Sequence, residues 1–200
     1  MDTAVGLVES YLHMNGYFTV SEYPVLELLD SGEVRTVTDV DVLAVRFPGA
    51  GRLHEGKMNR RIIELDPALH VDRERIDLII GEVKEGRADL NEAARDREVL
   101  HAALHRFGRA DEATVDVLID QLLDRGEAIH PAGVRVRLMS FGTRPPKQVR
   151  VRYRWLLMGS IMSHMHRVIE ENWTAARTLQ SKDPVLAMLI LQQKAVRGET

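Results

Sequence analysis

The spacing of apolar residues predicts a helix followed by three strands in the first half of the chain. Between residues 3 and 14 apolar side chains recur at helical spacing, and Asn15-Gly16 is typical of a helix end because both residue types tolerate positive φ. Two β-rich runs follow, and the turn-forming residues 30–33 between them predict an antiparallel hairpin. The three predicted strands cover residues 17–29, 34–47 and 76–84, and residues 48–75 predict an irregular excursion with a short helix or an extra strand.

The second half of the chain predicts helices around a fourth strand. A capping pair at Asp89 and Glu92 predicts the start of a helix, and Gly108 predicts its end. Asp183-Pro184 predicts the start of the last helix. The helices cover residues 89–107, 111–124, 153–179 and 183–196, the strand covers residues 133–141, and an extended edge covers residues 149–154. This order predicts an α/β fold, in which a mixed sheet carries helices on its faces.

The composition predicts a folded, cytoplasmic protein. The 200 residues are 44% apolar and 28% charged, which excludes a disordered chain and supports a single core. The chain has no cysteine, which excludes disulfides, thiol nucleophiles and zinc sites built on thiolates. It begins without a basic leader, and its longest apolar runs fall far short of the ~20 residues that span a bilayer, so no membrane partner is expected.

Basic residues gather in one part of the chain, although the net charge is −3. Residues 1–100 contain 12 Lys and Arg against 20 Asp and Glu, whereas residues 101–200 contain 15 against 10. Residues 128–169 contain no acid, and their eight basic residues are Arg135, Arg137, Arg144, Lys147, Arg150, Arg152, Arg154 and Arg167. This run predicts either a surface that binds phosphates or a solvated face that reflects the arginine-rich coding of the chain, with 22 Arg against 5 Lys.

Two predicted strands hold carboxylates where an apolar strand ordinarily has none. In the second strand, alternation predicts Asp39 and Asp41 on one face and the apolar residues 40, 42 and 44 on the other. In the third strand, Glu82 and Lys84 share a face, about 7 Å apart by strand rise. A buried carboxylate needs a cation beside it, and either the lysine or a metal ion meets that need.

These residues, in this order, resemble the PD-(D/E)XK nuclease superfamily, which has the restriction-endonuclease-like fold. Its pattern is an acidic residue on a first helix, an Asp on the second strand and Glu-X-Lys on the third, followed by a helix and a fourth strand. The matches here are Glu9, Asp41 and Glu82-Val83-Lys84, and they lie within about residues 3–141. Val40 stands in place of the proline of the family name, and Asp39 competes with Asp41 for the second-strand role.

The resemblance implies an αβββαβ core over residues 1–142. We expect the basic segment and C-terminal helices of residues 143–200, which lie beyond the resemblance, to pack on the same domain. The resemblance implies a metal-dependent deoxyribonuclease that acts on DNA, alone or as a subunit with a partner protein. Asp41, Glu82 and the carbonyl of Val83 would hold Mg²⁺ or Mn²⁺. Lys84 would orient or help deprotonate the attacking water, and Glu9 would hold a metal-bound water. The candidate DNA contacts are Arg144, Lys147, Arg150, Arg152 and Arg154.

Other interpretations stay open at this point. The same fold and basic segment also suit a non-catalytic nucleic-acid-binding or assembly protein, and an unrelated α/β enzyme is a third alternative. The intact acid and lysine set favours the nuclease. His101 and His105 have the i,i+4 spacing of a zinc-binding pair, but the sequence shows no third ligand. The C-terminal helices carry apolar residues on more than one face, which predicts that they are buried either within the chain or against a second copy of it.

Overall fold

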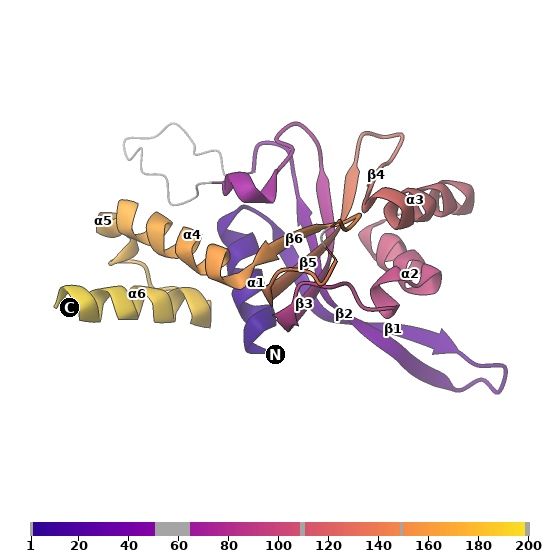
Figure 1. Ribbon diagram of the computed structural model, residues 1–200, viewed down its shortest axis with the longest axis horizontal. Coiled ribbons are helices and arrows are strands. Elements are labelled where there is room, and N and C mark those ends of the chain that lie inside the picture. Colours follow the sequence, from indigo (N-terminus) through magenta and orange to yellow (C-terminus); the bar gives the residue numbers. More distant parts are fainter. Residues whose placement is uncertain (1, 51–64, 109–110, 149, 199–200) are drawn as a thin grey trace.

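A mixed sheet forms the centre of the computed structural model, which describes residues 2–50, 65–108, 111–148 and 150–198 (Figure 1). The strands are β1 (Phe18–Leu28), β2 (Val34–Arg46), β3 (Asp77–Arg87), β4 (Glu127–Ile129), β5 (Arg135–Arg144) and β6 (Arg154–Leu157). Their order is β1-β2-β3-β5-β4. β4 pairs with the first residues of β5, and β6 pairs with later residues of the same strand, from Met139 to Gly142. The pairs β1–β2, β2–β3 and β4–β5 are antiparallel, whereas β3–β5 and β5–β6 are parallel. The predicted mixed α/β class is confirmed.

Helices cover both faces of this sheet. Within the described ranges they are α1 (Thr3–Met14), α2 (Arg97–Phe107), α3 (Glu112–Arg125), α4 (Met158–Glu171), α5 (Trp173–Ala176) and α6 (Pro184–Arg197), with 3₁₀ turns at Pro67–Leu69 and Ala93–Arg95. One apolar cluster joins α1, α4 and α6 to the sheet, and a second joins α2 and α3 to its other face (Figure 1). β3 is therefore apolar on both faces, with Ile79 in the first cluster and Ile80 in the second.

Local signals in the sequence set the ends of several helices, and the end of α1 at Asn15-Gly16 and the start of α6 at Asp183 are as predicted. Asp2 caps α1 by accepting a hydrogen bond from the Ala4 N–H, and α1 ends at Asn15 before Gly16, whose φ is +83°. Asp111 and Asp183 cap α3 and α6 in the same way. The hairpin of β1 and β2 also has the predicted antiparallel pairing.

The predicted start of a helix at Asp89 is wrong, because α2 begins at Arg97 after its cap Asp96. The Asp89 carboxylate instead accepts a hydrogen bond from the Lys147 N–H, at 3.0 Å. The Ala88 N–H donates to the Arg144 carbonyl oxygen, at 2.9 Å. These bonds fix the segment after β3 against the end of β5, so it cannot form the first turns of a helix.

The long helix predicted over residues 153–179 is also wrong in its first part. Arg154–Leu157 form β6, with Leu156 paired to Phe141, and the helix begins only at Met158 and ends before Asn172. Pairing with an exposed strand edge outweighs the helical spacing of these residues. Of the predicted extended edge, only Arg154 lies in a strand, and Val149 is outside the described residues.

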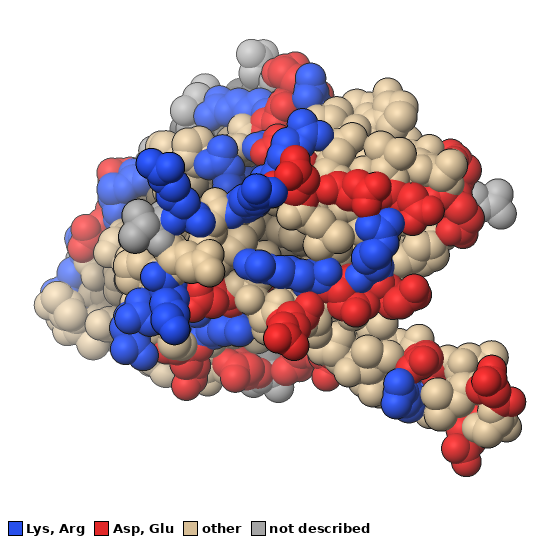
Figure 2. Space-filling model, turned by 45° about the vertical axis from the view of Figure 1, so that its right-hand side comes forward, with Lys and Arg blue, Asp and Glu red and all other residues tan. Residues whose placement is uncertain are grey.

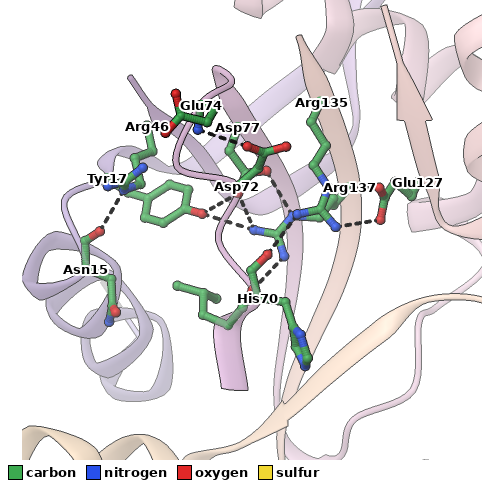
Figure 3. Close-up of polar contacts among 11 residues, drawn as sticks. Asn15, Tyr17, Arg46, His70, Asp72, Glu74, Asp77, Glu127, Arg135 and Arg137 are labelled. Carbon is green, nitrogen blue, oxygen red and sulfur yellow. Dashed lines mark hydrogen bonds and ion pairs between the residues drawn. The ribbon is translucent and has the colours of Figure 1, made fainter. Parts of the chain in front are cut away.

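Two arginines of the basic run are buried rather than exposed (Figure 3). The Arg137 side chain is 0% exposed, as is that of Asp77, and its Nε and Nη2 donate to the two Asp77 carboxylate oxygens at 2.9 and 2.7 Å. Arg137 also donates to the Tyr17 hydroxyl and to the Leu69 carbonyl oxygen. Arg135 binds Glu127 with two hydrogen bonds. The assignment of these two arginines to a basic surface is therefore wrong. Arg137 joins the start of β5 to the start of β3 and to Tyr17, just before β1, and Arg135 joins β5 to β4.

The C-terminal helices bury only part of their apolar surface within the described chain. Ile161 and Met165 of α4 and Leu189 of α6 enter the cluster that contains α1. Met188 and Leu191 remain 62% and 60% exposed. The burial of this face against a second copy of the chain stays a prediction. Among the helices that the structure describes, none has the length and apolar character needed to cross a membrane.

Candidate active site

The paired ladder between β2 and β3 ends where the predicted site begins. Val42 and Gly81 are the last paired residues, and one step further the Asp41 Oδ2 accepts a hydrogen bond from the Val83 N–H at 2.7 Å. That N–H belongs to the peptide group linking Glu82 to Val83. The Asp41 carboxylate thus accepts the hydrogen bond that a β2 backbone carbonyl would accept if the strand pairing continued. This bond places the carboxylate beside the Glu82 backbone.

The expected alternation of β2 breaks at Asp41. Val42 and Ala44 pack in the cluster with α1, but Val40 packs in the opposite cluster with α2 and α3, so the prediction that all three share a face is wrong. Across the strand pair lies Glu22, whose φ of +49° is in the left-handed region. A change of phase of this kind is typical of a β-bulge, which redirects side chains at functional sites.

Glu82 and Lys84 form an ion pair at the end of β3. The Lys84 Nζ lies 3.4 Å from the Glu82 Oε1, and the side chains are 33% and 10% exposed respectively. Burial, followed by the neighbouring Asp41 carboxylate, raises the pKa of Glu82 to about 7, against the opposing effect of Lys84. Near pH 7 both the protonated and the ionised form of this carboxyl group are therefore populated.

The surroundings of Asp41 are rich in negative charge. Burial is the main cause that raises the pKa of Asp41, and the Asp2 and Glu22 carboxylates raise it further. The Val83 N–H and the Lys84 ammonium group act in the opposite direction. Sequence reasoning missed Asp2 and Glu22, because a helix cap and a strand residue give no sign that the fold gathers them around Asp41.

Ser140 adds a polar group that the sequence also did not reveal. It lies opposite Glu82 in the parallel pairing of β3 with β5, it is fully buried, and its Oγ has no hydrogen-bond partner among the described residues. A cavity of about 10 Å³ on this side is lined by Asp39, Glu82 and Asn91, among others. That volume suits roughly one water molecule.

Glu9 does not share the contacts of this group. Its Oε1 accepts a hydrogen bond from the Thr19 hydroxyl at 2.8 Å, and the His13 Nε2 lies 2.7 Å from the same hydroxyl. Thr19 pairs with Ala44, three residues along β2 from Asp41. The structure thus brings together Asp41, Glu82, Val83 and Lys84. The carboxylate near α1 that acts on Asp41 is that of Asp2, the residue that caps this helix.

The remaining basic segment is exposed and begins beside this site. The exposed residues are Arg144, Lys147, Arg150, Arg152 and Arg154. Arg144 pairs with Arg87 at the end of the strand that carries Glu82 and Lys84, and the Arg87 guanidinium donates to the Pro145 carbonyl oxygen. On the face shown in Figure 2, basic side chains gather towards the left, whereas acidic ones dominate the right and the tip of the projecting β1–β2 hairpin.

The later part of the basic segment is fixed to the end of α3. Tyr153 is buried and donates a hydrogen bond to the Ala88 carbonyl oxygen, and the Arg152 guanidinium forms an exposed ion pair with Asp124 at 2.7 Å. The backbone of Arg152 passes so close to Gly126 that a side chain at position 126 would collide with the Arg152 carbonyl oxygen. The arginines therefore project from a backbone that packing holds in place.

Comparison with known proteins identifies no relative. No protein-family model matches the chain, and searches of curated proteins and of solved structures find no match. A functional assignment must therefore come from the chemistry of the site.

Proposed function

We propose that the protein is a metal-dependent deoxyribonuclease with a restriction-endonuclease-like core, and that Asp41, Glu82 and Lys84 form its active site. The observation that carries the proposal is the convergence of two partly desolvated carboxylates and a lysine where β2 and β3 separate. Perturbed ionisable groups of this kind, gathered at one place, are a mark of functional sites.

The donor set fits a hard divalent cation. Asp41 and Glu82 offer carboxylate oxygens, which Mg²⁺ and Mn²⁺ prefer, and the Val83 carbonyl is a third candidate ligand. Asp2 and Glu22 add to the negative charge around Asp41, which Lys84 alone does not balance. The buried Ser140 Oγ, unpartnered among the described residues, would complete the shell around Glu82. Bound there, the metal ion would acidify a water molecule and neutralise charge on the phosphodiester.

The residues of the chain would then act on water and phosphate. In hydrolysis the water oxygen bonds to phosphorus, the bond from phosphorus to one deoxyribose oxygen breaks, and a proton passes from the water to the departing oxygen. Lys84 would orient the water and stabilise the negative charge that develops in the transition state. Arg144 and Lys147, beside the end of β3, would bind neighbouring phosphates and fix the strand in register.

Cleavage of DNA by the purified full chain tests the proposal. Plasmid and single-stranded DNA should be cut in Mg²⁺ or Mn²⁺ and left intact in EDTA. Lys84→Ala and Asp41→Asn should each lower the rate by at least about 100-fold, since each removes a group that acts on the attacking water or its site. Asp39→Asn, an exposed carboxylate two residues from Asp41, is the matched control and should keep most of the activity.

The outcomes separate the proposal from its main alternative. Loss of cleavage in Asp39→Asn but not in Asp41→Asn would transfer the second-strand role to Asp39. DNA binding without cleavage in any metal would refute the nuclease and favour a nucleic-acid-binding protein, an alternative that the exposed arginines support independently of the carboxylates.

The exposed arginines are expected to contribute to DNA affinity through phosphate contacts. Reversing the charge of Arg150, Arg152 and Arg154 to Glu should weaken binding and reduce the slope of log affinity against log salt by roughly one per lost contact. Fluorescence anisotropy over a salt series measures this slope. Arg35→Glu on the projecting hairpin is the control, and an unchanged slope in the triple variant would mean that these arginines merely solvate the surface.

A further inference from the structure

Two histidines lie one turn apart on the outward side of α2. His101 and His105 have side chains that are 35% and 40% exposed, while Leu100 and Leu104 of the same helix are buried against the sheet. The two ring centroids are 4.3 Å apart, and the two Nε2 atoms are 3.3 Å apart. Both rings thus direct the same nitrogen to one point.

Glu112 approaches that point from the first turn of α3. Its Oε2 lies 2.8 Å from the His101 Nε2, and its Oε1 lies 3.6 Å from the His105 Nε2. α3 packs antiparallel beside α2, since Arg97 at the start of α2 reaches Asp116 and Asp120 further along α3. Glu112, seven positions after His105, therefore lies beside it. The third ligand missing from the sequence pattern is therefore supplied by the fold, and the three donor atoms all lie within 4.8 Å of one another.

We propose that His101, His105 and Glu112 bind a zinc ion. In a tetrahedral zinc site with bond lengths of about 2.0–2.1 Å, neighbouring ligand atoms lie roughly 3.3 Å apart. The two Nε2 atoms already have this separation, at 3.3 Å. The two Glu112 oxygens each lie near one of them, Oε2 at 2.8 Å from the His101 Nε2 and Oε1 at 3.6 Å from the His105 Nε2, so a rotation of the carboxylate would bring a single oxygen near both. Small side-chain adjustments would complete three corners of the tetrahedron, and the fourth faces solvent, where a water molecule would bind.

The donor chemistry separates this zinc site from the proposed nuclease site. Imidazole nitrogen suits zinc and its transition-metal neighbours, whereas Mg²⁺ prefers oxygen ligands. The zinc site shares no residue with Asp41, Glu82 and Lys84, so neither proposal depends on the other. A zinc ion there would also join α2 to the first turn of α3, and it should stabilise the folded chain by an amount that grows with the logarithm of the ratio of free zinc to Kd.

Zinc binding by the untagged full chain tests this inference. Competition with a chromophoric chelator should show one Zn²⁺ bound to the three residues. Co²⁺ in its place should give the intense visible absorption bands of tetrahedral cobalt. His101→Gln, His105→Gln and Glu112→Gln should each weaken binding by more than the roughly 10- to 100-fold that loss of an outer-shell partner costs. Because the three side chains are at least one-third exposed, the variants should keep their fold, which circular dichroism verifies.

Two further variants make the result specific. His166→Gln, a histidine of α4 outside the triad, should bind zinc as the wild type does. Glu82→Gln removes the carboxylate site as a competing zinc ligand, and it should retain the cobalt bands. The zinc site is refuted if the wild type gives no tetrahedral cobalt spectrum, or if the triad variants bind zinc as tightly as the wild type. Neither result would bear on cleavage in Mg²⁺.

Discussion

The Asp77→Asn variant is expected to lose about 3–5 kcal/mol of its free energy of unfolding, because it leaves a buried guanidinium without its counter-charge. Arg137 and Asp77 are both 0% exposed, and Asp77 also accepts a hydrogen bond from the Tyr17 hydroxyl at 2.7 Å. An amide provides only one acceptor oxygen and no negative charge. Domains of this size are commonly stable by only about 5–15 kcal/mol, so urea unfolding should show a large shift of the midpoint.

An exposed ion pair provides the matched control. Glu27 and Arg35 lie 2.6 Å apart on the hairpin, with side chains that are 45% and 63% exposed. Glu27→Gln makes the same chemical change as Asp77→Asn, but water replaces the lost partner, so the unfolding midpoint should hardly move. Adding Arg137→Met to Asp77→Asn should recover part of the lost stability, because the unpaired charge is then gone. An Asp77→Asn protein as stable as the wild type would show that the buried pair does not hold the strands together.

Where a local signal sets the structure, the sequence predicted it correctly. Helix α1 has a left-handed Gly16 after its end, α6 has its cap at Asp183, and the β1–β2 hairpin has turn residues between two β-rich runs. The errors fall where distant contacts decide. Asp89 has the residue type of a helix cap, but the loop after β5 binds its carboxylate. The segment Arg154–Leu157 has helical spacing, but the free edge of β5 pairs with it.

The same distinction applies to the candidate sites. Asp41, Glu82 and Lys84 could be found because carboxylates are unusual in apolar strands and because their order resembles a known pattern. Ser140 and Glu112 could not, since a serine in a strand and a glutamate in the first turn of a helix are ordinary. Their significance comes from the pairing of β3 with β5 and from the packing of α3 against α2. Such contacts depend on topology, which a single sequence specifies only weakly.

Glu82→Gln is expected to stabilise the metal-free protein above neutral pH, although it should abolish cleavage. The pKa of Glu82 in the folded chain is about 7, above its ordinary value of 4.5. The folded state therefore holds a proton that the unfolded state releases. This contribution to stability is complete below about pH 4.5 and is lost as the pH rises through 7. The difference corresponds to on the order of 3 kcal/mol. Gln cannot ionise, so the variant should avoid this loss.

Urea unfolding in EDTA at pH 5 and pH 8 measures the effect. From pH 5 to pH 8 the free energy of unfolding of the wild type should fall more than that of Glu82→Gln. Glu85 is an exposed glutamate of the same strand, and Glu85→Gln should show the same fall as the wild type. Addition of Mg²⁺ at pH 8 should restore the wild type but not Glu82→Gln, because a ligand that binds only the folded state stabilises it. If Glu82→Gln is instead less stable than the wild type at pH 8, then Glu82 serves chiefly as the ion-pair partner of Lys84. The carboxylates would then be structural groups, and the strand end would have no need of a metal ion.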